Sequence, residues 1–207
     1  NLLRKPHAPR GVVDFSGDVL AEVGNVNFKD LKFDIMASGW RQPGSTFKVF
    51  TYGALVERLA NQVLAEQPSG ENTEDAVAQV LERCNVLDAP FSVSLGRGRG
   101  EKKIENFHSR SEPQYRGEMS CRTALGESRN TAAMRAGATA GIKNVIDLAY
   151  RVGIPKDPKH MLQPYPTTAI GASEVNPLAM AGTAAFVNGG FRVTPRFAND
   201  VCQDGKS

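Results

Sequence analysis

The segment Arg41–Lys48 reads Arg-Gln-Pro-Gly-Ser-Thr-Phe-Lys and leads into a strongly apolar run that extends to Leu59. Apolar residues occupy nearly every face of this run, which predicts a buried helix over 45–59. Ser45 lies at the start of that helix, and Lys48 lies three residues later on the same face. We therefore expect the two side chains to meet.

Ser45 and Lys48 together have the chemistry of an acylation site. The free N–H groups at a helix N-terminus, and the positive end of its dipole, favour an oxyanion at Ser45. Burial in so apolar a helix disfavours the ammonium form of Lys48, so we expect its pKa to fall toward the range in which the amine acts as a base. A serine that only caps its helix and a lysine that reaches solvent would give the same Ser-x-x-Lys pattern.

A second polar cluster, Ser128-Arg129-Asn130, lies in a break between two helical patterns. In an extended turn the first and third side chains point the same way. Ser128 would then supply a hydroxyl for proton relay, and Asn130 an amide that binds a substrate carbonyl. The alternative is that these two residues only stop one helix and cap the next.

The remaining sequence predicts an α+β fold with helices packed on an antiparallel sheet. Turn-forming residues between two short β-branched runs predict a β-hairpin over 11–24. A strand is expected over 191–193, and a flexible basic loop over 96–103. Apolar spacing and helix-capping residues predict further helices over 73–83, from about 119 to 127, and over 131–140, 144–152 and 177–187.

Composition excludes several classes of protein. The 207 residues, 41% of them hydrophobic, fit one globular domain or a large part of one. The formal net charge of +3 comes from both signs spread along the chain, so no nucleic-acid partner is expected. No apolar stretch approaches the roughly 20 residues that a transmembrane helix needs. Cys84, Cys121 and Cys202 lack metal-site spacing, so no metal is expected, and their pairing is left open.

Two segments carry a resemblance to a known family. Arg41–Lys48 resembles the active-site segment of the class A (bifunctional) penicillin-binding proteins, and Ala124–Thr131 resembles the second motif of that family, including its middle arginine. The segments Asp14–Gly24 and Gly171–Leu178 are also similar to family segments in the same order. The resemblance implies the fold of penicillin-binding proteins and serine β-lactamases, an antiparallel sheet with a helical subdomain.

The resemblance also implies a function. The family's domain is a penicillin-sensitive DD-transpeptidase that crosslinks peptidoglycan stem peptides ending in D-Ala-D-Ala and binds β-lactam antibiotics. By that resemblance Ser45 is the nucleophile and Lys48 is its base. Ser128 relays a proton to the leaving D-alanine, and Asn130 binds the amide backbone of the substrate. No metal or organic cofactor is implied. A glycosyltransferase domain and a membrane anchor are expected in the full protein, at the periplasmic face of the bacterial inner membrane.

One departure from the family concerns its third motif, Lys-Thr-Gly, which does not occur in the chain. We therefore expect a partial transpeptidase domain with an incomplete sheet, inactive by itself. Its parts would be a hairpin and lead-in over 1–44, a mainly helical part with the motifs over 45–190, and the first returning strands over 191–207. Two alternatives remain open: a non-catalytic relative that binds peptide or acts as a scaffold, and a serine β-lactamase or β-lactam sensor.

Overall fold

The computed structural model describes residues 10–24, 29, 32–66, 72–94, 100–107 and 113–198. Contacts divide the chain into two compact units. The first comprises residues 1–43, 149–162 and 173–207, and the second comprises residues 44–148 and 163–172. Among the described helices, none combines the length and the apolar character that crossing a bilayer requires.

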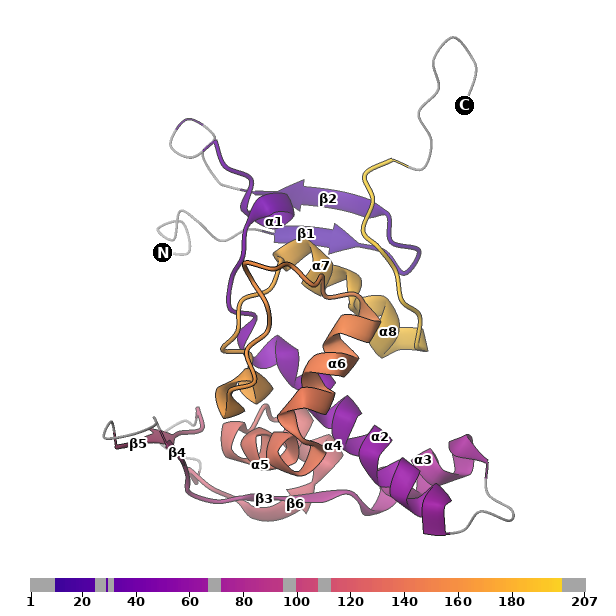
Figure 1. The fold of residues 1–207 in the computed structure, drawn as a ribbon, viewed down its shortest axis with the longest axis vertical. Helices are drawn as coiled ribbons and strands as arrows, with labels where there is room; N and C mark the ends of the chain where they lie inside the picture. Colours follow the sequence, from indigo (N-terminus) through magenta and orange to yellow (C-terminus); the bar gives the residue numbers. More distant parts are fainter. Residues whose placement is uncertain are drawn as a thin grey trace. The chain divides into compact units, whose positions relative to one another are not determined.

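The first unit begins with the predicted hairpin (Figure 1). Strands β1 (Arg10–Val13) and β2 (Val19–Val23) pair in antiparallel register. The turn between them is closed by Asp14, whose Oδ1 accepts hydrogen bonds from the backbone N–H of Ser16 at 2.9 Å and of Asp18 at 2.9 Å. An aspartate whose carboxylate accepts hydrogen bonds from the backbone N–H groups that follow it is typical of turns. The prediction of a hairpin is therefore confirmed.

The helical elements of the first unit differ in part from the prediction. The unit contains α1 (Ile35–Ser38), α7 (Pro177–Gly182) and α8 (Ala184–Gly189). Asn176 caps α7 as expected, because its Oδ1 accepts from the N–H of Ala179 at 2.9 Å. The single helix predicted over 177–187 is wrong, since it is interrupted at Thr183. There the side-chain hydroxyl donates to the carbonyl of Met180 at 2.7 Å, which ends α7.

The strand predicted over 191–193 is also wrong. Pairing occurs instead at Arg196, which forms an isolated parallel bridge with Asp18, and the N–H of Val19 donates to the carbonyl of Arg196 at 2.9 Å. Pro195 has no N–H to donate to a ladder, which disfavours a continuous strand here. The predicted returning strands beyond residue 198 lie outside the described residues.

The second unit is built around the long helix α2 (Lys48–Glu66), which follows a 3₁₀ turn, η2 (Gly44–Phe47). The buried helix predicted over 45–59 is confirmed, with a tighter first turn and a longer C-terminal end. Figure 1 shows the helices and strands that make up the rest of this unit. They are α3 (Thr73–Arg83), α4 (Cys121–Gly126), α5 (Asn130–Ala140), η3 (Pro166–Ile170), β3 (Asn85–Asp88), β4 (Phe91–Ser94), β5 (Glu101–Ile104) and β6 (Gly117–Ser120). Helix α6 (Ile142–Val152) continues from the second unit into the first.

The strands of the second unit were not predicted from the sequence. β3 pairs with β6 and β4 pairs with β5, both antiparallel. The loop predicted over 96–103 is therefore wrong at 101–103, where charged residues form a strand and only Ile104 of β5 is buried. Residues 96–99 of that loop lie outside the described residues. The helix predicted from about Met119 begins two residues later, because Met119 pairs with Val86 in the β3–β6 ladder.

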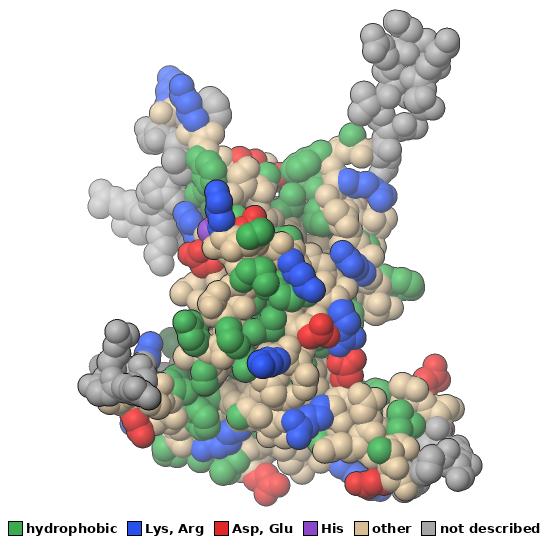
Figure 2. Space-filling model, viewed as in Figure 1, with side chains coloured by type: hydrophobic (Ala, Val, Ile, Leu, Met, Phe, Trp, Pro, Cys, Tyr) green, Lys and Arg blue, Asp and Glu red, His purple; other side chains and the backbone are tan. Residues whose placement is uncertain are grey.

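The described strands form three two-stranded antiparallel sheets beside the helices, so the expected α+β class is confirmed. Basic and acidic side chains are both scattered over the face shown in Figure 2. The division of the chain at residues 44 and 190 stays a prediction.

A disulfide joins Cys84, which follows α3, to Cys121, which begins α4. The sequence left this pairing open, and Cys202 lies outside the described residues. The disulfide lies at one end of the β3–β6 pair. At that end the N–H of Cys121 also donates to the carbonyl of Cys84 at 2.8 Å. The disulfide thereby ties the segment that leads into Ser128 to the end of α3.

Replacing both Cys84 and Cys121 by serine is expected to lower the free energy of unfolding by about 2 to 4 kcal/mol. The bond spans 37 residues, so its loss increases the entropy of the unfolded chain substantially. Urea unfolding of the full-length protein with and without reductant measures the effect. Reductant should lower the midpoint of the wild type and leave that of the double variant unchanged. Equal midpoints for the oxidised wild type and the double variant would contradict the expectation.

Candidate active site

Ser45 lies in the 3₁₀ turn η2, immediately before α2, and its side chain is exposed. Two glycines fix this turn. The N–H of Gly44 donates to the carbonyl of Gly171 at 3.2 Å, and Gly171 has a φ of 80°. A Cβ atom at Gly171 would lie 2.1 Å from the carbonyl oxygen of Gly44, so only glycine permits this approach. The backbone beside Ser45 is thus held against η3 while its hydroxyl stays accessible.

Lys48, the first residue of α2, has a fully buried side chain. Its Nζ donates to the carbonyl oxygen of Ser128 at 2.5 Å, to the hydroxyl oxygen of Ser128 at 3.0 Å and to Oδ1 of Asn130 at 2.7 Å. The structure therefore brings together three of the four site residues that the sequence singled out. The fourth, Ser45, lies three residues before Lys48 in the turn that precedes the same helix, and the expected contact between the Ser45 and Lys48 side chains stays a prediction.

Burial lowers the pKa of Lys48 from an ordinary value of 10.5 to about 8. The shift has the sign expected for an ammonium group removed from water. At neutral pH roughly a tenth of such a group is the free amine, which is the form that accepts a proton. The predicted fall in the pKa of Lys48 agrees with this value.

Ser128 has a φ of 56°, and it is the one non-glycine residue with a positive φ in the part of the chain that the structure describes. The extended turn expected at Ser128 is therefore wrong for this residue, and only Arg129 is extended, with φ −66° and ψ 119°. Backbone bonds hold the turn, since the N–H of Ser128 donates to Leu125 at 3.0 Å and that of Arg129 to Ala124 at 3.0 Å. The unusual conformation presents both oxygens of Ser128 to Lys48.

Asn130 begins α5 and is held from two sides. Its Nδ2 donates to the carbonyl of Glu105 at 2.8 Å, and its backbone N–H donates to Oδ1 of Asn106 at 2.7 Å. These bonds orient the amide so that Oδ1 accepts from Lys48. The assigned role of Asn130 in binding a substrate amide stays a prediction.

A buried network beneath this cluster was missed by sequence reasoning. Asp88, at the end of β3, is fully buried and is paired with Arg129 at 2.7 Å. It also accepts from Nδ2 of Asn106 at 2.7 Å, from the backbone N–H of Arg116 at 3.0 Å and from the hydroxyl of Thr131. The available signal was a carboxylate in the otherwise apolar run of residues 86–91, since a charge there needs a buried partner.

Two opposing effects act on Asp88. Burial by itself would raise the pKa of its carboxyl group, but hydrogen bonds from Thr131, Asn106 and Arg129 outweigh burial and hold the pKa below its usual value. Asp88 therefore remains ionised at neutral pH and serves as the fixed negative charge on which Arg129 is anchored.

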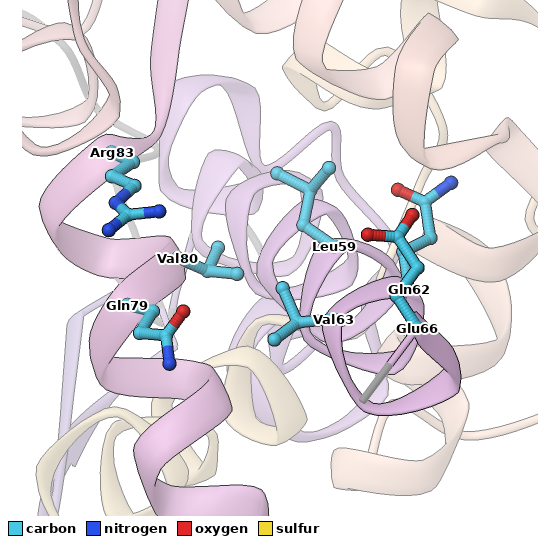
Figure 3. A pocket seen from close by; sticks show the side chains of 7 residues that line it. All are labelled: Leu59, Gln62, Val63, Glu66, Gln79, Val80 and Arg83. Atoms are coloured by element: carbon cyan, nitrogen blue, oxygen red, sulfur yellow. The ribbon is translucent and has the colours of Figure 1, made fainter. Parts of the chain in front are cut away.

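Two cavities lie within the second unit, and their described linings do not include the four site residues. One of about 440 Å³ is lined mainly by β4 and α5. The other, of about 290 Å³, lies between α2 and α3 (Figure 3). Leu59, Val63 and Val80 form its apolar lining, and polar side chains lie at its edges. Among the described residues, no cluster of His, Cys, Asp or Glu could hold a metal ion.

The curated proteins similar to this chain include penicillin-binding proteins 1A. No family model matches the chain. Penicillin-binding protein 1A of Rickettsia conorii is 31% identical over 185 residues, 88% of this chain and 20% of that protein. Penicillin-binding protein 1A of Haemophilus influenzae is 30% identical over 181 residues, 87% of this chain and 18% of that protein.

Solved structures agree with these relatives. The crystal structure of penicillin-binding protein 1A from Haemophilus influenzae matches with a TM-score of 0.66 and 26% identity, over 91% of this chain and 24% of that chain. A penicillin-binding protein from Mycobacterium tuberculosis matches with a TM-score of 0.65 and 22% identity, over 90% of this chain and 43% of that chain, and shows the shared fold.

The fold is that of penicillin-binding protein transpeptidase domains, and the chain is similar to a part of penicillin-binding protein 1A. Because the relatives named above are penicillin-binding proteins 1A, the resemblance seen in Arg41–Lys48 and Ala124–Thr131 is confirmed. The chain spans about a fifth of the length of those relatives.

Proposed function

We propose that the chain carries the acylating centre of a penicillin-sensitive DD-transpeptidase, with Ser45 as the nucleophile and Lys48 as its base. The observation that carries the proposal is the state of Lys48. It is fully buried, its pKa is lowered to about 8, and it is bound to Ser128 and Asn130 at the entry to the helix that follows the exposed Ser45. A lysine in this condition is unsuited to a surface role and suited to proton transfer.

These positions support the following reaction. Neutral Lys48 takes the proton of the Ser45 hydroxyl, and the Ser45 oxygen attacks the carbonyl carbon between the two D-alanines of a stem peptide. The C–N bond then breaks, and the leaving D-alanine amine receives a proton through the hydroxyl of Ser128. Asn130 binds the amide backbone of the substrate. An amine of a neighbouring stem peptide attacks the acyl carbonyl carbon, the bond from that carbon to the Ser45 oxygen breaks, and the proton lost by the amine returns to Ser45, which completes the crosslink.

The proposed setting is the periplasmic face of the bacterial inner membrane. The disulfide between Cys84 and Cys121 supports it, because structural disulfides persist in oxidising compartments and are rare in the cytosol. The chain spans about a fifth of its relatives, which leaves room for the glycosyltransferase domain and the membrane anchor that we propose for the full protein. β-Lactam antibiotics are the proposed inhibitors, and Ser45 is the residue that we propose they acylate.

Mass spectrometry of the full-length protein after incubation with penicillin tests the function. A penicilloyl group mapped to Ser45 is expected, and it should be lost in Ser45→Ala. The matched control Ser92→Ala, which removes an exposed serine of the same unit, should keep the adduct. No adduct on the wild type would overturn the proposal in favour of a non-catalytic relative. An adduct that hydrolyses within seconds would overturn it in favour of a β-lactamase.

The acylation rate is expected to rise with pH through a midpoint near 8, the pKa to which burial lowers Lys48. The sign follows from the role of a base, because only the neutral amine accepts a proton and its fraction grows as the pH passes the pKa. Stopped-flow measurement with a fluorescent penicillin between pH 6 and about 9.5 checks this. A flat profile over that range would exclude Lys48 as the titrating base.

A further inference from the structure

Two consecutive residues after β5 hold the N-terminus of α5. The carbonyl of Glu105 accepts from Nδ2 of Asn130 at 2.8 Å. Oδ1 of Asn106 accepts from the N–H of Asn130 at 2.7 Å and from that of Thr131 at 3.2 Å. Arg129, at the N-cap position of α5, makes no side-chain capping bond. An N-cap side chain accepts a hydrogen bond from a free N–H group in the first turn of its helix. Asn106 has this role for α5, although it lies outside that helix.

Asn106 is itself rigidly placed, with only 6% of its surface exposed. Its Nδ2 donates to Oδ1 of Asp88 at 2.7 Å and to the carbonyl of Gln114 at 3.0 Å. Asp88 is in turn fixed by its ion pair with Arg129. The oxygen and the nitrogen of the Asn106 side-chain amide are thus both hydrogen-bonded, and these partners allow the side chain one orientation.

We infer that Asn106 is a positioning residue for the Lys48 base, which it serves by fixing Asn130, the acceptor of one of the three hydrogen bonds of Lys48. The inference rests on the proposed function of Lys48. Without Asn106, the first turn of α5 loses the acceptor for two N–H groups, and Asn130 keeps only the bond from its Nδ2 to the carbonyl of Glu105, so its Oδ1 is held less firmly toward the amine. The hydrogen bond from the ammonium form of Lys48 to Asn130 is then weakened, while the free amine loses little.

The charged groups around the cluster already have partners, and Tyr52, one turn after Lys48 in α2, stays neutral because burial raises the pKa of its hydroxyl. Asp88 pairs with Arg129, and Arg116 pairs with Glu127 at 3.0 Å. On α5, the guanidinium of Arg135 donates to backbone carbonyls between β3 and β4. The side chain of Glu105 points into solvent and lies 3.9 Å from Lys103. Burial, rather than a neighbouring charge, sets the pKa of Lys48, so a changed acceptor should be visible in its titration.

The test is the pH profile of acylation by a fluorescent penicillin in the full-length protein carrying Asn106→Ala. The midpoint of the rising limb is expected to move down by about one pH unit, and the plateau rate to fall about tenfold, because Asn130 is less firmly held. A purely structural role would lower the amount of active protein without moving the midpoint.

Thr131→Val is the matched control. It removes one donor to Asp88 and the acceptor of a 3.3 Å hydrogen bond from Nδ2 of Asn106, but it keeps the N–H groups of Asn130 and Thr131 on Oδ1 of Asn106. It should lower stability and leave the midpoint unchanged. If Asn106→Ala does not fold, Asn106→Ser serves instead, since a serine hydroxyl is too short to reach both N–H groups.

The outcomes separate the two proposals. If the wild type is not acylated at all, the proposed function fails. If the wild type is acylated with a midpoint near pH 8 and the Asn106 variant keeps that midpoint, the function stands and the positioning role of Asn106 is overturned. A midpoint shift shared equally by Thr131→Val would also overturn it, because the effect would then belong to the network as a whole.

Discussion

Replacing Lys48 by methionine is expected to slow the acylation of Ser45 by penicillin about 1,000-fold, within the range that removal of a general base produces. Methionine has a similar length and no charge, so it fills the fully buried site of Lys48 without a desolvation cost. The residual rate should lose its dependence on pH near 8, because the group that titrates there is gone. Single-turnover kinetics with a fluorescent penicillin measure both effects.

Two further variants separate the loss of the base from other causes. Lys143→Met removes an exposed lysine of α6 and should leave the acylation rate unchanged. Lys48→Arg keeps a positive charge and hydrogen-bond donors but does not lose its proton, so it should be as slow as Lys48→Met. A Lys48→Met rate within tenfold of the wild type would contradict the assigned role.

The chemistry of this site was accessible from the sequence because it is local. Ser45 and Lys48 are separated by one helical turn, and the apolar residues around them predict burial without any knowledge of the fold. The hairpin and the helix over 73–83 were likewise predicted, since turn residues and apolar spacing act within a few residues. That Lys48 contacts Ser128 could be inferred only through the family resemblance, because nothing local joins residues so far apart.

The hydrogen-bond network of Asp88 and Asn106 could not be predicted, because neither residue lies in a sequence pattern that indicates its buried partners. Asp88 ends a four-residue strand, and Asn106 follows another strand whose first three residues are charged and exposed. Strands this short carry too little alternation to be distinguished from loops. Only the paired strands reveal that Asp88 and Asn106 meet beneath the turn at Ser128. Similarly, the positive φ of Ser128 depends on contacts with α4 that the sequence does not display.

Replacing Arg129 by methionine is expected to lower the free energy of unfolding by about 3 to 5 kcal/mol, since it leaves a buried carboxylate without its partner. Asp88 would lose the hydrogen bond from Nε of Arg129 and the ion pair with its Nη2, both at 2.7 Å. Urea unfolding of the full-length protein measures the change. Glu127→Gln is the matched control, because it breaks the partly exposed pair with Arg116 and should cost less than about 1 kcal/mol.

The pH dependence of this loss identifies its cause. In the wild type the pKa of Asp88 lies below its usual value, so the carboxylate contributes stability above the unfolded pKa of 3.8, and that stability is lost as pH falls through the folded pKa. In Arg129→Met, fewer hydrogen bonds oppose the effect of burial, so the pKa of Asp88 should rise. Acidification then protonates the carboxyl group and removes the cost of burying an unpaired charge. The difference in the free energy of unfolding between variant and wild type should therefore become smaller from pH 7 to about pH 4. A difference that stays constant with pH would mean that lost packing, rather than the unpaired charge of Asp88, destabilises the variant.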